Sequence, residues 1–156
     1  MIDRSTVLNM ENAHIVFRNF RGEERGQYNK AGDRNFSVVI EDEELAQQLI
    51  EDGWKVKIRK PKREDAEPFY HLPVKVSFKY PPKIVRIAGK HKTLLDEDSI
   101  GCLDFDDIAR VDLVIRPYIW NVNDGHGVKA YVKSMYVTVL EDEFASRYDD
   151  EEFPED

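Results

Sequence analysis

VDLVIRPYIWNVNDGHGVKAYVKSMYVTVL (residues 111–140) is the clearest structural signal in this 156-residue chain. On both sides of the segment NVNDGHG, apolar residues alternate with polar or aromatic ones, which is typical of β-strands. Asp124-Gly125 within that segment is a strong signal for a tight hairpin turn. The stretch therefore predicts two long antiparallel strands that pair with each other.

Each of these strands gathers cations and aromatic rings on one face. The residues that share a face are Arg116, Tyr118 and Trp120 on the first strand, and Lys129, Tyr131 and Lys133 on the second. If the register lets the two faces coincide, the hairpin displays three cations and three rings on one surface. Met135 and Val137 have the same parity as Lys129 but are apolar. The second strand must therefore exchange its faces, twist, or be buried on both sides.

The period of the apolar residues becomes helical over residues 42–52. Leu45, Ala46, Leu49 and Ile50 fall on one face of a helix there. Asp42 can cap its N-terminus, and Gly53 can adopt the left-handed conformation that follows many helices. We expect one helix of about three turns.

The rest of the chain is strand-like. We expect strands at 13–20, 35–40, 54–60 and 74–80, a short edge strand at 81–88, and one helical turn within 95–107. Strands and helices do not alternate regularly, which argues against a doubly wound parallel sheet. We predict a mainly β, mostly antiparallel barrel with one inserted helix, and an OB-fold fits this size and mixture best. The barrel would span residues 1–140, followed by a disordered acidic C-terminal tail at 141–156.

Charge is distributed unevenly. The last sixteen residues, EDEFASRYDDEEFPED, hold nine carboxylates and one arginine, so they contribute 1−9 = −8, which equals the formal net charge of the whole chain. The other 140 residues are neutral in sum. Between Trp54 and Leu95, however, twelve bases face only three acids, a net +9 that the overall balance hides.

The composition also limits the class of protein. Cys102 is the only cysteine, so neither an intramolecular disulfide nor a cysteine-based zinc site can form. The four histidines lie far apart, and no glycine-rich phosphate loop is present, so we expect neither a metal nor a cofactor. No apolar run is long enough to cross a bilayer, and we expect a soluble, intracellular protein.

Basic residues interleaved with aromatic ones suit a single strand of nucleic acid. Cations neutralise phosphates and release counterions, while unpaired bases stack on rings. A duplex hides its base faces, so the interleaving favours single strands. Each element alone has a simpler explanation, because strand tyrosines and tryptophans often pack half-buried and alternating lysines often form a solvated face.

Two blocks, NKAGDRNFSVVIEDEELAQQLIEDGWKVK (29–57) and VIRPYIWNVNDGHGVKAYVKSMYVTV (114–139), resemble the single-stranded-DNA-binding proteins of tailed bacteriophages, an OB-fold family. The resemblance implies a non-enzymatic protein that coats single-stranded DNA with little sequence preference during phage DNA replication and recombination, in the cytoplasm of the infected bacterium. It supports Arg34 and Phe36 as DNA contacts alongside the hairpin residues. The full set of expected contacts is Arg34, Phe36, Lys55, Lys57, Arg59, Lys75, Lys79, Arg116, Tyr118, Trp120, Lys129, Tyr131 and Lys133.

The acidic tail is expected to regulate access to DNA. It can occupy a cationic groove until DNA displaces it and then bind replication or recombination proteins. The residues expected to bind such partners are Asp149, Asp150, Glu151, Glu152 and Phe153. A charge run that only aids solubility is the alternative. Exposed sheet edges or the tail can also mediate homo-oligomerisation, which the sequence leaves open.

Two other functions stay open at this point. A metal-dependent nuclease can be built on paired carboxylates, and the candidates are Asp104, Asp106, Asp107 and Asp112. No nearby lysine or histidine completes such a site. The other alternative is a barrel that binds proteins and never contacts DNA.

Overall fold

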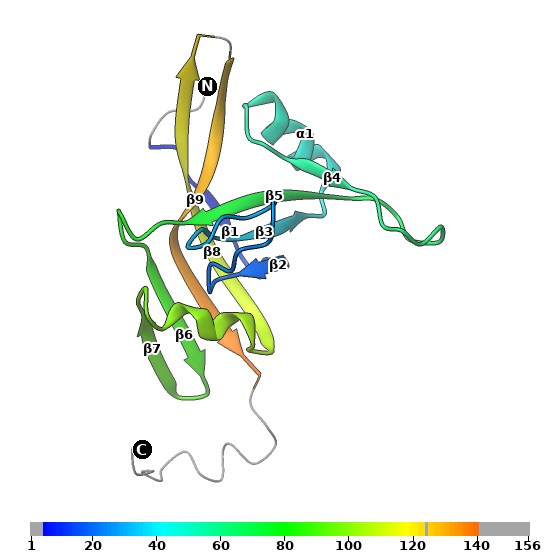
Figure 1. Ribbon diagram of the computed structural model, residues 1–156. Helices are drawn as coiled ribbons and strands as arrows, with labels where there is room; N and C mark the ends of the chain where they lie inside the picture. The colour runs from blue at the N-terminus through cyan, green and yellow to red at the C-terminus, as the bar shows by residue number, and fades with distance from the viewer. Residues whose placement is uncertain (1–4, 124, 141–156) are drawn as a thin grey trace.

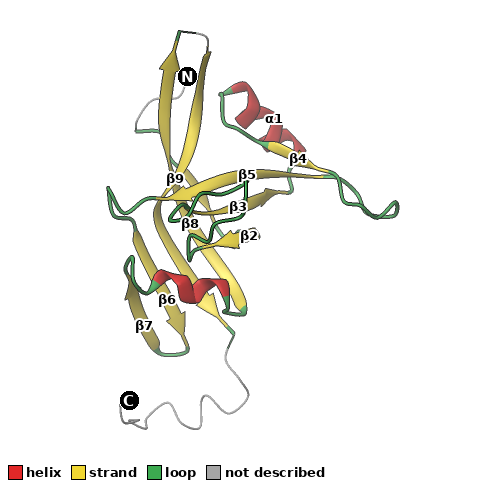
Figure 2. Ribbon diagram, in the orientation of Figure 1, coloured by secondary structure: helices red, strands yellow, loops and turns green. Residues whose placement is uncertain are grey.

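The computed structural model describes residues 5–123 and 125–140, and strands are its dominant element (Figure 1). In chain order the elements are β1 (Leu8–Met10), β2 (Ile15–Asn19), β3 (Arg34–Ile40), α1 (Glu43–Glu51), β4 (Lys57–Arg59), β5 (Phe69–Val76), β6 (Lys83–Ala88), β7 (His91–Leu95), the 3₁₀ helix η1 (Ile100–Asp104), β8 (Ile108–Val122) and β9 (Gly125–Val139). Figure 2 shows how small a share of the fold is helical. The predicted mainly β class is confirmed. The expected tail, 141–156, lies outside the described residues.

The strands form one sheet whose central path runs β1-β8-β9-β5-β3-β2. Its pairs are antiparallel except for β5 with β9 and β6 with β9. The ladder is open, but the sheet curls back on itself. Ala13, just before β2, donates a 2.7 Å hydrogen bond to the carbonyl of Val111 in β8. Asn12 donates its backbone N–H to the Asp112 carboxylate at 3.0 Å, so both contacts join the segment between β1 and β2 to β8.

The β8–β9 hairpin is the longest feature, and its tip extends beyond the rest of the sheet (Figure 1). A β-bulge in β9 explains the change of parity along this strand. Val114 pairs with Ser134 and Ile115 pairs with Val132, so Lys133 is the extra residue. Before the bulge Val132 faces the core, and after it Met135 does. The second strand therefore exchanges its faces, one of the possibilities that the alternation left open.

Helix α1 forms where the sequence predicts it. Asp42 is the N-cap, and its carboxylate accepts hydrogen bonds from the backbone N–H groups of Glu44 at 3.0 Å and Leu45 at 3.4 Å. Gly53 follows the helix with φ +94°, a conformation that favours glycine. The buried face is narrower than expected, since only Ala46 and Leu49 are buried. Among the described residues, neither helix has the length and apolar character needed to span a bilayer.

Several strand boundaries differ from the prediction. The expected strand at 54–60 is reduced to β4, because the chain turns directly after α1 and Trp54 donates its N–H to the carbonyl of Leu49. The strand expected at 74–80 begins earlier and ends at Val76. The expected edge strand at 81–88 forms as β6, but it lies between β7 and β9 and is not an edge. The expected helical turn within 95–107 is η1, whereas β1 and β7 were not expected.

Candidate nucleic-acid interface

The register of the β8–β9 hairpin brings its two polar-aromatic faces together. Arg116 lies directly opposite Tyr131, and Tyr118 lies directly opposite Lys129. Side chains of directly opposed residues project from the same face of a sheet. The opposite face carries the buried residues Ile115 and Ala130. We call the outer surface of Arg116, Tyr118, Trp120, Lys129 and Tyr131 the hairpin face.

Rings and cations on the hairpin face pack against one another. The guanidinium carbon of Arg116 lies 4.8 Å from the ring centroid of Tyr131 and 6.0 Å from that of Tyr80. The Tyr118 and Tyr131 rings meet edge to face, with centroids 6.0 Å apart. Tyr118 nevertheless stays 52% exposed. A guanidinium held over a ring keeps its hydrogen-bond donors available for a phosphate, so these contacts organise the surface before a ligand arrives.

Trp120 packs close to the β9 backbone at the far end of the hairpin face. Its opposite residue is Gly127, and a Cβ atom there would come within 2.9 Å of Trp120 Cζ2. Only glycine leaves this space free. Lys55 Nζ lies 5.1 Å from the Trp120 ring centroid, which adds a second pairing of cation and ring. Trp120 is therefore half-buried, with its orientation fixed by a glycine.

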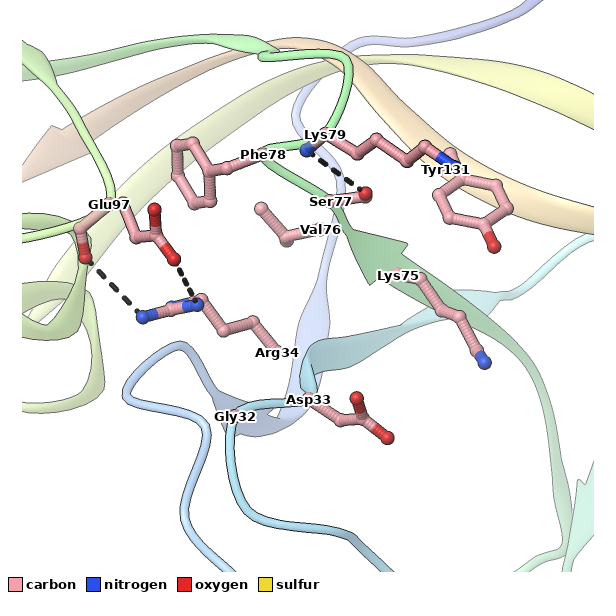
Figure 3. A pocket seen from close by; sticks show the side chains of 10 residues that line it. All are labelled: Gly32, Asp33, Arg34, Lys75, Val76, Ser77, Phe78, Lys79, Glu97 and Tyr131. Atoms are coloured by element: carbon pink, nitrogen blue, oxygen red, sulfur yellow. Dashed lines mark hydrogen bonds and ion pairs between the residues drawn. The ribbon is translucent and has the colours of Figure 1, made fainter.

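Neighbouring strands extend this surface with further cations. Lys75 of β5 pairs with Tyr131 of β9, and Tyr131 pairs with Arg116 of β8, so the three side chains form one row across the sheet. A hollow of about 430 Å³ lies beside the row and is lined in part by Lys75, Phe78, Lys79 and Tyr131 (Figure 3). Lys75 and Lys79 therefore line the same hollow as Tyr131.

The expected contact Arg34 also lines this hollow, but its charge is partly compensated. Arg34 Nη1 lies 3.6 Å from Glu97 Oε1, and its guanidinium carbon lies 5.6 Å from the Phe78 ring centroid. Figure 3 shows Arg34 extended toward Glu97, whereas Lys75 extends the other way. In the part of the chain that the structure describes, no ion pair engages Lys75 or any cation of the hairpin face. Lys75 and the cations of the hairpin face are therefore available for phosphates.

Phe36 is placed differently from its sequence-based assignment. It lies in the core with 1% of its surface exposed and stacks on Phe20 at a centroid distance of 5.2 Å. It pairs with Val74, which is also buried, so it projects from the inner face of β3. We therefore leave Phe36 out of the interface and assign it to core packing.

Three expected contacts lie away from the hairpin face. Lys57 and Arg59 are on β4, opposite His71 and Phe69, at the end of β5 remote from Lys75. Lys133 is exposed at the bulge of β9. The structure thus brings most of the predicted contacts together but places the β4 cations in a second region of the sheet.

Tyr80 is a member of the surface that the sequence interpretation missed. It is 67% exposed, lies under Arg116, and has Lys79 Nζ 5.9 Å from its ring centroid. In the strand expected at 74–80, Tyr80 has the same parity as Val76, which is buried. Because β5 ends at Val76, that alternation does not reach Tyr80. The two prolines directly after Tyr80 were the available signal that a regular strand does not continue.

Three of the four carboxylates of the nuclease alternative, those of Asp104, Asp106 and Asp112, have structural partners. Asp104 accepts hydrogen bonds from the backbone N–H of Phe20 at 2.8 Å and of Arg21 at 3.0 Å, which ties η1 to the end of β2. Asp106 binds Arg86 with two hydrogen bonds of 2.8 and 3.0 Å, and these raise the pKa of the guanidinium.

Asp112 is paired in the same way. Its carboxylate accepts hydrogen bonds from Arg110 Nε at 3.1 Å, and these lower its pKa below the usual value. Among residues 5–123 and 125–140, no cluster of three or more His, Cys, Asp or Glu side chains is arranged to hold a metal ion. These acids are already engaged in holding strands and loops together.

Known proteins share the fold of this chain. The structure of the single-stranded DNA-binding protein from bacteriophage Enc34 in complex with ssDNA is similar over 89% of this chain and 89% of its own, with a TM-score of 0.58 and 12% identity. Another structure of that protein gives a TM-score of 0.55 at 11% identity, over 89% of this chain and 84% of its own. At such identities the likeness shows the fold. No curated protein sequence matches the chain. A family model described as "Putative phage ssDNA-binding domain" matches residues 2–156, so the chain belongs to the phage ssDNA-binding domain family.

Proposed function

We propose that the protein binds single-stranded DNA with little sequence preference, on the hairpin face together with Lys75, Lys79 and Tyr80. The observation that carries this proposal is the β8–β9 register, which sets Arg116 opposite Tyr131 and Lys129 opposite Tyr118. The register makes a ring and a cation immediate neighbours twice on one outer surface. The family match and the fold shared with the Enc34 protein support the same conclusion.

The proposed mechanism combines stacking with charge neutralisation. Unpaired bases stack on Tyr118 and Tyr131, and each stack contributes about 1–3 kcal/mol with little dependence on the base. Lys75, Lys129 and Arg116 lie beside these rings and neutralise the phosphates of the same nucleotides. Bases in a duplex are covered on both faces, so duplex DNA would bind through charge neutralisation alone, without stacking.

The test is a titration with a thymidine oligonucleotide, followed by tryptophan fluorescence at several salt concentrations. Trp54 is 3% exposed, so quenching would report on Trp120. Log affinity should fall linearly with log salt, with a slope of about −0.7 for each phosphate contacted. A duplex of the same length should bind more weakly. The absence of binding at low salt would overturn the proposal and favour the barrel that binds only proteins.

Matched lysine variants sharpen this test. Lys75→Gln removes a cation from the proposed surface and should reduce the salt slope by about 0.7. Lys92→Gln removes an exposed cation from β7, in the β6–β7 hairpin, and should leave the slope unchanged. If the two variants change the salt slope equally, DNA binding depends on the total charge of the protein and not on this surface.

We propose a coating role in phage DNA replication and recombination, without catalysis, in the cytoplasm of the infected bacterium. The partners of Asp104, Asp106 and Asp112 support the non-enzymatic part, since these carboxylates are engaged by backbone N–H groups and arginines. Incubation of labelled single strands with Mg²⁺ should give no cleavage. Cleavage that disappears in Asp106→Ala would instead identify a nuclease.

The acidic tail, which lies outside the described residues, is proposed to compete with DNA for the cationic surface. When DNA displaces it, the segment Asp149–Phe153 becomes available to replication or recombination proteins. Its net charge of −8, from nine carboxylates and one arginine, against an otherwise neutral chain supports this role. Deletion of 141–156 should tighten DNA binding at low salt and matter less at high salt. Unchanged or weaker binding at low salt would rule out the competition.

A further inference from the structure

A second group of rings lies at the end of β5 remote from the hairpin face. The ring centroids of Phe17 and His71 are 5.4 Å apart, those of Phe69 and His71 are 5.9 Å apart, and those of Phe17 and Phe69 are 6.5 Å apart. The guanidinium carbon of Arg59 lies 5.5 Å from the Phe17 ring centroid. We call Phe17, Phe69, His71 and Arg59 the β2–β5 ring cluster.

The backbone at Phe17 turns its ring outward. Phe17 has φ +55°, which is rare for a bulky residue that is not glycine, and the β2–β3 register shifts between Val16 and Asn19 around it. The ring remains 47% exposed. A phenylalanine that served only the core would gain nothing from a strained backbone that leaves half its surface in water. Strain of this kind is concentrated at binding sites.

Strand β5 joins this cluster to the hairpin face. Phe69, His71, Pro73 and Lys75 are alternate residues of β5 and so project from one side of the strand, with His71 buried on that side. Lys75 pairs with Tyr131 at one end, and Phe69 pairs with Arg59 at the other. Figure 1 shows β5 running from β9 to β4. The two ring groups therefore share one face of the sheet and lie about 20 Å apart along β5, at roughly 3.3 Å per residue.

The cluster has the same chemistry as the hairpin face. Lys57 and Arg59 are both exposed, and neither takes part in an ion pair within the described residues. His71 is held by a 3.0 Å hydrogen bond to Ser37. Burial lowers the pKa of His71, and the charges of Lys57 and Arg59 lower it further. Near neutral pH the buried His71 is therefore uncharged, and the rings of Phe17 and Phe69 lie beside two cations that form no ion pair within the described residues.

We propose that the β2–β5 ring cluster is a second stacking subsite, where a base several nucleotides away from the hairpin stacks on Phe17 and Phe69. Arg59 and Lys57 bind the adjoining phosphates, and the strand follows the outer face of β5 between the two subsites. This inference rests on the proposed binding of single-stranded DNA by the hairpin face. It assigns a role to the β4 cations that the hairpin face leaves unused.

The test compares thymidine oligonucleotides of two lengths, about four and about sixteen nucleotides, a range that spans the usual site sizes of OB-folds. Phe17→Gly removes the ring and suits a positive φ, so the variant should fold. Phe17→Tyr keeps a ring. The control is Phe105→Ala, which removes a ring that is 71% exposed under Arg21 at 4.6 Å but belongs to neither ring group. Binding is followed by the fluorescence of Trp120, which reports only complexes at the hairpin.

Phe17→Gly should weaken binding of the long oligonucleotide by about tenfold, the loss of roughly one stacked base. Binding of the short oligonucleotide at the hairpin should not change. Phe17→Tyr and Phe105→Ala should behave as the wild type at both lengths. If the wild-type protein binds the long oligonucleotide and Phe17→Gly does not weaken that binding, the second subsite is overturned and the proposed function stands. Equal weakening at both lengths would also overturn it. A wild type that binds neither length would overturn both proposals.

Discussion

Tyr131 is the centre of the proposed interface, and replacing it separates the stacking contribution from the charge contribution. It pairs with Lys75, packs under Arg116 at 4.8 Å and meets the Tyr118 ring at 6.0 Å. Tyr131→Leu keeps an apolar side chain of similar bulk on the outer face but removes the aromatic ring. No charge changes, so the number of phosphates that the protein can neutralise stays the same.

The expected loss follows from the contacts. One stacked base is worth about 1–3 kcal/mol, and the cation–π contact that positions Arg116 is worth about 0.5–1 kcal/mol at an exposed site. The sum is about 1.5–4 kcal/mol, so affinity should fall by roughly 10-fold to 700-fold, since every 1.4 kcal/mol is a factor of ten. The slope of log affinity against log salt should not change, because that slope counts phosphates.

The assay is the salt-dependent titration of a thymidine oligonucleotide, with Tyr28→Leu as the control. Tyr28 is 86% exposed but lies in the loop between β2 and β3. The Tyr28→Leu variant should bind DNA with the same affinity as the wild-type protein. Unchanged affinity in Tyr131→Leu would refute the stacking argument. If the salt slope decreased while the affinity stayed constant, the ring would act only by positioning nearby cations such as Arg116.

Three further outcomes are expected. Gly127→Ala should displace the Trp120 indole, because the new Cβ would lie 2.9 Å from Trp120 Cζ2. The variant should show a shifted fluorescence emission and weaker quenching by DNA. An unchanged emission would contradict the close packing. Asp106→Ala should lower the free energy of unfolding by about 2 kcal/mol, measured in urea, because Arg86 loses two charged hydrogen bonds, while DNA affinity stays the same. The pKa of His71 is lowered from 6.5 in the folded state, so the unfolded state binds more protons and stability should decrease as pH falls below about 6.5. His71→Gln should flatten that pH dependence in thermal unfolding, and an unchanged profile would place its origin elsewhere.

Local signals in the sequence were sufficient for the hairpin and the helix. The alternation around Asp124-Gly125 and the cap at Asp42 depend on neighbouring residues, which a single sequence displays. The parity of Arg116 and Tyr131 was also readable, and the register confirms that the two faces coincide. These local features are the ones that the structure brings together in the candidate site.

The remaining features depend on long-range pairing. The bulge at Lys133 is set by how β9 meets two different sets of partners, and the alternation shows only that some exchange of faces is needed. Phe36 faces inward because β3 pairs with β5 through Val74, which no local pattern reports. Phe17 lies outward because of one positive φ angle. Tertiary contacts therefore decided which rings are exposed.

Photo-crosslinking tests the central claim most directly, because it locates the bound strand on the protein. A thymidine oligonucleotide is irradiated in complex with the full chain, and the modified peptides are identified by mass spectrometry. Our account predicts crosslinks on the hairpin face, at Tyr118 and Tyr131, that a single-stranded competitor removes and a duplex removes poorly. Crosslinks confined to rings elsewhere, such as Tyr28 or Phe105, would contradict it.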